Sequence, residues 1–370
     1  MNVKFYSMKF INDAISESLE ASFKSFIKDS NYVLGDRVRM FESAYSKFNR
    51  TKYCIGTSNG LDSLILCLKS LNIGKGDEVI VPSNTFIATV LAVIHCGATP
   101  IFVEPDIKTY NLDHNLLEDA LTNKTKAVIA VNLYGNPCDF KSILKFTHKN
   151  KIYLIEDNAQ AQGASWDNQL TGSFGDVNAV SFYPGKNLGA YGDAGAVTTN
   201  FKNLNKVIRS LRNYGSSIKY QNEFIGYNFR MDECQAGFLS IKLKHLEDWN
   251  NERIKTSKLY FNELSSIEGL VLPTILENAK SVFHIFNIRT SKRNELKEFL
   301  DQNGIETLIH YPIPPHLQDC FKYLNYKEGS FPIAEELART SLSLPIWPGI
   351  KKEDVFYVCD QIKRFMNESQ

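Results

Sequence analysis

One lysine, Lys186, lies at a position where it could act as a nucleophile. It belongs to the turn Tyr183-Pro184-Gly185-Lys186, between the strand-like segment 178–180 and the loop 189–196, which is rich in small residues. A lysine that loses its hydration in such a turn has a lowered pKa and can form a Schiff base with a carbonyl. A single loop lysine is more often solvated, so this interpretation depends on polar residues elsewhere in the chain.

Polar residues follow predicted strands at three further places. The turn Thr57-Ser58-Asn59-Gly60 lies between a strand and a helix, where backbone amides can bind a phosphate, although many such turns are only helix N-caps. Asn84-Thr85-Phe86 adds an aromatic side chain, and Glu156-Asp157 ends an apolar strand, where a buried carboxylate needs a cationic partner. Functional groups gather at the carboxyl ends of parallel strands. We therefore expect these segments to form one site with Ser181 and Lys186.

The elements expected to position these residues alternate between short apolar strands and helices. The expected strands are 53–55, 78–81, 100–103, 127–131 and 152–155, and the helices between them are 61–71, 86–96, 116–121 and 140–149. This alternation predicts an α/β fold with a mostly parallel sheet covered by helices.

Two helical segments flank this region: 11–48, which we expect to be broken at Gly35-Asp36, and 233–264. The C-terminal part combines a strand-like segment, 282–289, with helices at 294–302 and 352–367. We predict a large domain over 1–245, which includes the N-terminal helical segment, and a smaller C-terminal α/β domain over 246–370.

The charge balance and the cysteines limit the classes of partner. The 370 residues carry 42 Lys and Arg against 41 Asp and Glu, so the net charge of +1 gives no reason to expect nucleic acid or a membrane as partner. No apolar run is long enough for a membrane span, and the N-terminus lacks the pattern of a signal peptide. Seven cysteines without CxxC pairing favour free thiols in the cytoplasm over disulfides or a metal site.

Taken in order, six segments resemble the fold type I pyridoxal-phosphate enzymes, and more narrowly the sugar-nucleotide aminotransferases of the DegT/DnrJ/EryC1/StrS family. They span most of the chain with family-like spacing: 56–60, 82–86, 156–161, 181–189, 226–231 and 310–312. The resemblance implies a large domain with a mostly parallel, seven-stranded type of sheet, a smaller C-terminal α/β domain, pyridoxal 5'-phosphate as cofactor and no metal.

The resemblance also implies a role for each matching residue. Lys186 would hold the cofactor aldehyde and move a proton, and Asp157 would pair with the pyridine nitrogen. Gln160 would bond the ring oxygen, Phe86 would stack on the ring, and Asn228 would reach the phosphate across the interface of a homodimer. The residues implied to hold the phosphate are Thr57, Ser58, Asn59 and Ser181. Glu156 is left open between a structural role and assistance to the sugar.

The implied reaction moves an amino group from L-glutamate to a nucleotide-linked keto-deoxysugar. A catalytically silent cofactor-binding protein on the same scaffold is an alternative, but it would be free to lose Lys186 or Asp157. A nucleotide-binding oxidoreductase is a further alternative, but it is expected to carry a G-x-G-x-x-G turn after the first strand, and 56–60 does not match that pattern.

Three residues are expected to face the sugar: Tyr183, His310 and Tyr311. We expect His310 to titrate near neutral pH and to bond a sugar hydroxyl or relay a proton. The run 309–318, together with Tyr183, resembles family members that act at C-3 of dTDP-3-keto-6-deoxyhexoses. This predicts a dTDP-3-amino-3,6-dideoxyhexose as product, for surface polysaccharide such as the O-antigen of lipopolysaccharide. Amination at C-4 of a 4-keto sugar nucleotide remains the alternative.

Overall fold

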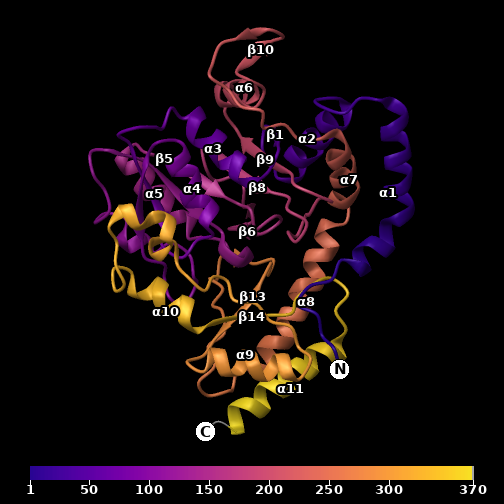
Figure 1. The fold of residues 1–370 in the computed structure, drawn as a ribbon, viewed down its shortest axis with the longest axis vertical. Helices are drawn as coiled ribbons and strands as arrows, with labels where there is room; N and C mark the ends of the chain where they lie inside the picture. Colours follow the sequence, from indigo (N-terminus) through magenta and orange to yellow (C-terminus); the bar gives the residue numbers. More distant parts are fainter. Residues whose placement is uncertain (369–370) are drawn as a thin grey trace.

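A seven-stranded sheet forms the centre of the computed structural model, which describes residues 1–368 (Figure 1). Its strand order is β1-β9-β8-β5-β4-β2-β3. Strand β9 runs antiparallel to both of its neighbours, and the other neighbours are parallel. The strands are β1 (Tyr53–Thr57), β2 (Glu78–Pro82), β3 (Thr99–Val103), β4 (Thr125–Val131), β5 (Tyr153–Asp157), β8 (Val177–Ser181) and β9 (Gly195–Thr199). The predicted α/β fold with a mostly parallel sheet is confirmed.

Helices cover both faces of this sheet because successive side chains along each strand point to opposite faces. On one face, Val79, Val81 and Ile129 pack against α3 (Gly60–Ser70), α4 (Ile87–His95) and α6 (Lys202–Leu211). On the other face, Ile80 and Val128 pack against α5 (Phe140–Asn150). Further along that face, Val180 packs against α2 (Asp36–Phe48) and α7 (Glu233–Leu243). The apolar strands are therefore buried from both sides.

A smaller unit lies beside the N-terminus and includes the last helix, α11 (Lys352–Glu368) (Figure 1). Its strands β13 (Phe286–Arg289) and β14 (Ser341–Leu344) are antiparallel, and its helices are α8 (Leu246–Leu264), α9 (Arg293–Gln302) and α11. The N-terminal residue Val3 is buried in this unit's core. Conversely, Phe321 and Leu337, the latter in α10 (Pro332–Thr340), pack against the core of the large sheet. The division at 245/246 stays a prediction, and its last two residues, 369–370, lie outside the described part.

The remaining elements are peripheral. Helix α1 (Lys9–Asp29) lies along α7, and the hairpin of β10 (Ser216–Ile218) and β11 (Gln221–Asn222) projects beyond α6 (Figure 1). A small sheet joins β6 (Ser165–Trp166), β7 (Gln169–Leu170) and β12 (Ala279–Lys280). Within residues 1–368, no helix combines the length and apolar character of a membrane span.

Two predicted helices differ from the structure. The expected helix at 116–121 is wrong: a single 3-10 turn, His114–Leu116, begins at the Asp113 cap and turns follow it, since so short a segment does not propagate a helix. The expected helix 233–264 is two helices, α7 and α8, which are separated at Lys244-His245. Helices α6 and α10 and strand β14 had no counterpart in the prediction.

Candidate active site

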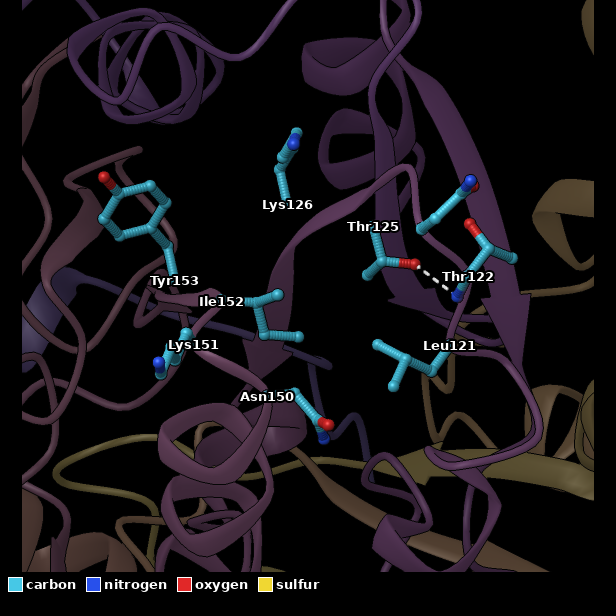
Figure 2. Close-up of a pocket in the computed structure, with 9 residues that line it drawn as sticks. Leu121, Thr122, Thr125, Lys126, Asn150, Lys151, Ile152 and Tyr153 are labelled. Atoms are coloured by element: carbon cyan, nitrogen blue, oxygen red, sulfur yellow. Dashed lines mark hydrogen bonds between the residues drawn. The ribbon is translucent and has the colours of Figure 1, made fainter.

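A large cavity, with a volume of about 670 Å³, lies at the carboxyl ends of the parallel strands. The large unit contributes the ends of β4, β5 and β8 and the first residues of α3 and α4. The smaller unit contributes His284, Leu308, His310 and Tyr311. A second pocket, about 310 Å³, lies at the opposite, amino ends of the strands, where β4 and β5 begin (Figure 2). Its lysines, Lys126 and Lys151, are exposed, so the large cavity is the candidate site.

Lys186 and Asp157 both line this cavity. Lys186 is held by a tight turn, in which its N–H donates to the Tyr183 carbonyl at 2.8 Å. A side chain on Gly189 would come within 2.2 Å of the Pro184 carbonyl, so the turn requires glycine there. Desolvation lowers the Lys186 pKa from 10.5 to about 8, although the Asp157 charge opposes this shift. At neutral to mildly alkaline pH this lysine therefore has a substantial unprotonated fraction.

The Asp157 carboxylate is buried at the floor of the cavity. It accepts hydrogen bonds from the Thr89 hydroxyl at 2.9 Å and the Ala159 N–H at 3.2 Å. Burial raises the pKa of Asp157, and the nearby Lys186 charge opposes that rise. Within residues 1–368 no salt bridge reaches Asp157. A buried carboxylate in this setting is matched to a ligand that carries a cationic nitrogen.

Glu156 points to the opposite face of the sheet. Its carboxylate accepts hydrogen bonds from the Asn132 amide at 2.7 Å and from the N–H groups of Gly172 and Phe174 at 2.5 and 3.1 Å. Burial raises its pKa to about 7. Of the two roles left open for Glu156, this geometry supports the structural one: it fixes the loop 172–174.

The N-terminus of α3 lies directly against the end of β8. A side chain on Gly60 would bring its Cβ within 2.7 Å of the Ser181 Cβ, so only glycine allows this approach. Asn59 caps the helix by accepting from the Asp62 N–H at 2.9 Å. The first N–H groups of a helix lack partners within the helix and attract anions. The close approach thus places the N-terminus of α3 beside Ser181, and we call these two groups together the cradle, which could bind an anion such as a phosphate.

Only some of the residues that were predicted to hold the phosphate face the cavity. Asn59 and Ser181 line it. The Thr57 side chain is fully buried and shares a 2.6 Å hydrogen bond with the Ser63 hydroxyl. The Ser58 hydroxyl donates to the Asp62 carboxylate. The side chains of Thr57 and Ser58 are therefore engaged within the protein.

The predicted ring contacts lie together on one wall. Phe86 lines the cavity, is 49% exposed, and its ring centroid lies 5.4 Å from that of Tyr311. Gln160 donates from its amide to the Tyr311 hydroxyl at 3.0 Å and accepts from the Tyr134 N–H at 2.6 Å. These bonds fix the orientation of the Gln160 amide at the cavity edge.

His310 and Tyr183 also line the cavity, and the titration predicted for His310 is wrong. Burial, together with the Lys186 charge, lowers the His310 pKa to about 4. The ring is therefore neutral at physiological pH, and its Nδ1 lies 2.9 Å from the Ser343 hydroxyl. Neutral imidazole can still bond a hydroxyl group, but its charge does not change near pH 7.

Asn228 is not among the residues that line this cavity. It forms an isolated antiparallel bridge with Asn213 beside the hairpin β10–β11. Two side chains of this region are almost fully exposed, Tyr220 at 87% and Ile225 at 97%. The structure therefore separates Asn228 from the other predicted cofactor residues of the same chain.

Among the polar residues that line the cavity, three were not predicted from the sequence. His284 lies beside Lys186, which together with burial keeps its pKa well below 6.5, and its Nδ1 is 3.1 Å from the Asn187 side-chain oxygen. Asp193 lines the cavity after the Lys186 turn. Tyr6 donates from its hydroxyl to the Pro184 carbonyl at 3.2 Å. The sequence held a local signal only for Asp193, because the N-terminal segment and the smaller unit reach the site through tertiary packing.

Two lysines, Lys186 and Lys242, have strongly lowered pKa values, and their different accessibility provides a test of the position of Lys186 in the cavity. Burial lowers the Lys242 pKa to about 7, but Lys242 is 1% exposed and donates to the Gly189 carbonyl at 2.7 Å. We expect a small acylating reagent at pH 8 to label Lys186 faster than exposed lysines and to leave Lys242 unlabelled, because only Lys186 is both unprotonated and accessible. Peptide mapping by mass spectrometry measures both sites. Equal labelling of Lys186 and surface lysines would contradict the lowered pKa.

Comparisons with known proteins agree with this site. The model of the DegT/DnrJ/EryC1/StrS aminotransferase family matches residues 13–363. The chain is 43% identical to dTDP-3-amino-3,6-dideoxy-alpha-D-galactopyranose transaminase of Aneurinibacillus thermoaerophilus, over 98% of this chain and 99% of that protein. It is 40% identical to dTDP-3-amino-3,4,6-trideoxy-alpha-D-glucose transaminase of Streptomyces venezuelae, over 98% and 96%. The crystal structure of S. venezuelae DesV in complex with a ketimine intermediate superposes with a TM-score of 0.97 at 40% identity, covering 99% of this chain and 98% of that one. The chain therefore belongs to the DegT/DnrJ/EryC1/StrS aminotransferase family.

Proposed function

We propose that this sugar-nucleotide aminotransferase moves the amino group of L-glutamate to C-3 of a dTDP-3-keto-6-deoxyhexose, giving dTDP-3-amino-3,6-dideoxyhexose. The observation that carries the chemistry is the pairing of a lysine of lowered pKa, Lys186, with a buried carboxylate, Asp157, in one cavity. A silent binding protein has no need of either group, whereas amino transfer needs both.

The cofactor that fits this cavity is pyridoxal 5'-phosphate. Its pyridine nitrogen suits the buried Asp157 carboxylate, and its phosphate suits the N-terminus of α3 beside Ser181. When bound, it supplies the aldehyde that accepts the amino group and the ring that takes up electrons. The family to which the chain belongs is one of aminotransferases, which supports this assignment.

The residues of this chain then have distinct tasks. Lys186 would attach the cofactor and would move a proton at the reacting carbon, since its amine is largely unprotonated above pH 8. Asp157, held by Thr89, would keep the cationic nitrogen of the cofactor charged. Phe86 would cover the ring and Gln160 would bond its oxygen, while Asn59 and Ser181 would hold the phosphate, since all four line the cavity. His310, Tyr311 and Tyr183 form the wall toward the sugar, and the neutral His310 serves there as a hydrogen-bonding group.

The names of two relatives support C-3 over C-4, because both describe a dTDP sugar with a 3-amino group. Amination at C-4 remains the second candidate, since the cofactor residues do not depend on the position.

The product would serve in surface polysaccharide such as O-antigen, and we place the enzyme in the cytoplasm, where nucleotide-linked sugars are made.

We further propose a homodimer in which Asn228 completes the partner's phosphate site. The exposed apolar side chains of Tyr220 and Ile225, in the same region as Asn228, support this arrangement. Such groups favour burial in an interface. The absence of Asn228 from its own chain's cavity lining has the same implication.

The position of amination is tested directly with substrates. We expect purified enzyme with glutamate to aminate the 3-keto sugar nucleotide and not the 4-keto isomer, with the product identified by NMR. The Lys186→Ala protein is the control, and it should form no product with either. Exclusive amination of the 4-keto compound would contradict the C-3 assignment.

Neighbouring carboxylates should respond differently to removal of their charge. Asp157→Asn should lower kcat by about 10² or more at nearly unchanged stability, because it removes an electrostatic contact to the cofactor. Glu156→Gln should lower the free energy of unfolding by about 1–3 kcal/mol, because its amide would face N–H donors, while kcat stays near that of the wild type. Steady-state kinetics and urea denaturation measure both. A stable, fully active Asp157→Asn would contradict its role.

The shared site makes a complementation test possible. Asn228→Ala and Lys186→Ala homodimers should both be impaired. Mixed dimers would contain one site with both residues intact, so that unfolding and refolding an equal mixture should restore about a quarter of the sites. Activity at only the sum of the two parents would show that Asn228 does not act across an interface.

A further inference from the structure

Strand β1 is an edge strand whose outer backbone groups are bonded by side chains instead of by another strand. Its only partner in the described sheet is β9. On the open side, the Gly56 N–H donates to Glu42 Oε1 at 2.8 Å, and Arg212 Nη1 donates to the Gly56 carbonyl at 2.6 Å. Arg209 Nη2 donates to the Cys54 carbonyl at 3.0 Å. Edge groups left bare would be open to mispairing.

The three side chains also pair with one another. Glu42 accepts from Arg212 Nη1 at 2.7 Å and lies 2.8 Å from Arg209 Nη1. Glu42 is 5% exposed and Arg212 is 6% exposed. Breaking one of these pairs would leave a buried charge without compensation, which is strongly destabilising.

This group touches two functional segments at once. Gly56 directly precedes the turn 57–60, which forms the phosphate cradle with Ser181. The carbonyl of Arg212 accepts from the Phe229 N–H at 2.9 Å, and the carbonyl of Leu211 accepts from the Tyr227 N–H at 2.7 Å. The residues before and after Asn228 are therefore bonded to the same end of α6 that carries the arginines.

We propose that Glu42, Arg209 and Arg212, here called the edge clamp, are positioning residues for the cofactor phosphate. The clamp holds the cradle turn of its own site and, through α6, the Asn228 segment that is offered to the partner's site. This assignment rests on the proposed function, which places the phosphate in the cradle. A purely structural ion pair would cost stability when broken, but it would leave the cofactor affinity of the folded protein unchanged.

The test compares two buried carboxylates of equal exposure. Glu335 in α10 is also 5% exposed, and it accepts from His316 Nε2 at 3.0 Å and from the Gly329 N–H at 2.9 Å, away from the cavity lining. Apo dimers of the wild type, Glu42→Gln and Glu335→Gln would be titrated with pyridoxal 5'-phosphate by visible absorbance. The melting temperature of each apo protein would be measured in parallel.

We expect the cofactor dissociation constant of Glu42→Gln to rise at least about tenfold, and that of Glu335→Gln to stay at the wild-type value, even where both melting temperatures fall. A Glu42→Gln constant within about twofold of the wild type would overturn the proposal. If Glu42→Gln fails to fold, Arg209→Gln, at a more exposed site, should raise the constant about threefold, and an unchanged value would overturn the proposal equally. Wild-type protein that does not bind the cofactor would instead contradict the proposed function.

Discussion

The interaction on which this site depends most is the electrostatic influence that the buried carboxylate of Asp157 and the amine of Lys186 exert on each other across one cavity, without a direct salt bridge between the two. Burial raises the pKa of Asp157 and lowers the pKa of Lys186, so that it favours the neutral form of each group. The charge of each residue partly opposes the shift of the other. Burial of such a pair costs free energy. A cationic ligand beside the Asp157 carboxylate would offset that cost. The cavity thus combines a lysine that can lose its proton with a carboxylate that needs a cation.

The fold meets this requirement by bringing distant segments to one edge of the sheet. Parallel strands deliver Asp157 and Ser181 from β5 and β8, and helix N-termini deliver Asn59 and Phe86. The smaller unit closes the cavity with His310 and Tyr311, and the N-terminal segment adds a hydrogen bond from Tyr6 to the Lys186 turn. Glycines at 60 and 189 allow close approaches that any side chain would prevent.

The sequence allowed the central sheet and the chemical core of the site to be predicted, because both rest on local patterns. Apolar runs separated by helices specify parallel strands, and polar residues close after those runs indicate the end of the sheet where Lys186 and Asp157 line one cavity. Features set by tertiary packing could not be read in this way. The low pKa of His310 depends on its burial near Lys186, and the engagement of Thr57 depends on Ser63 packing beneath it. Helix α10 lacked a distinctive pattern, and its packing onto the large sheet became evident only in three dimensions.

The central claim is that Lys186 is the residue to which the cofactor is attached. Borohydride reduction of the protein loaded with pyridoxal 5'-phosphate makes such an attachment permanent, and tryptic mapping by mass spectrometry then locates the pyridoxyl group. We expect this group on the peptide that contains Lys186, in an amount that matches the bound cofactor. A pyridoxyl group on a different lysine, or no modified peptide from cofactor-saturated protein, would contradict the claim.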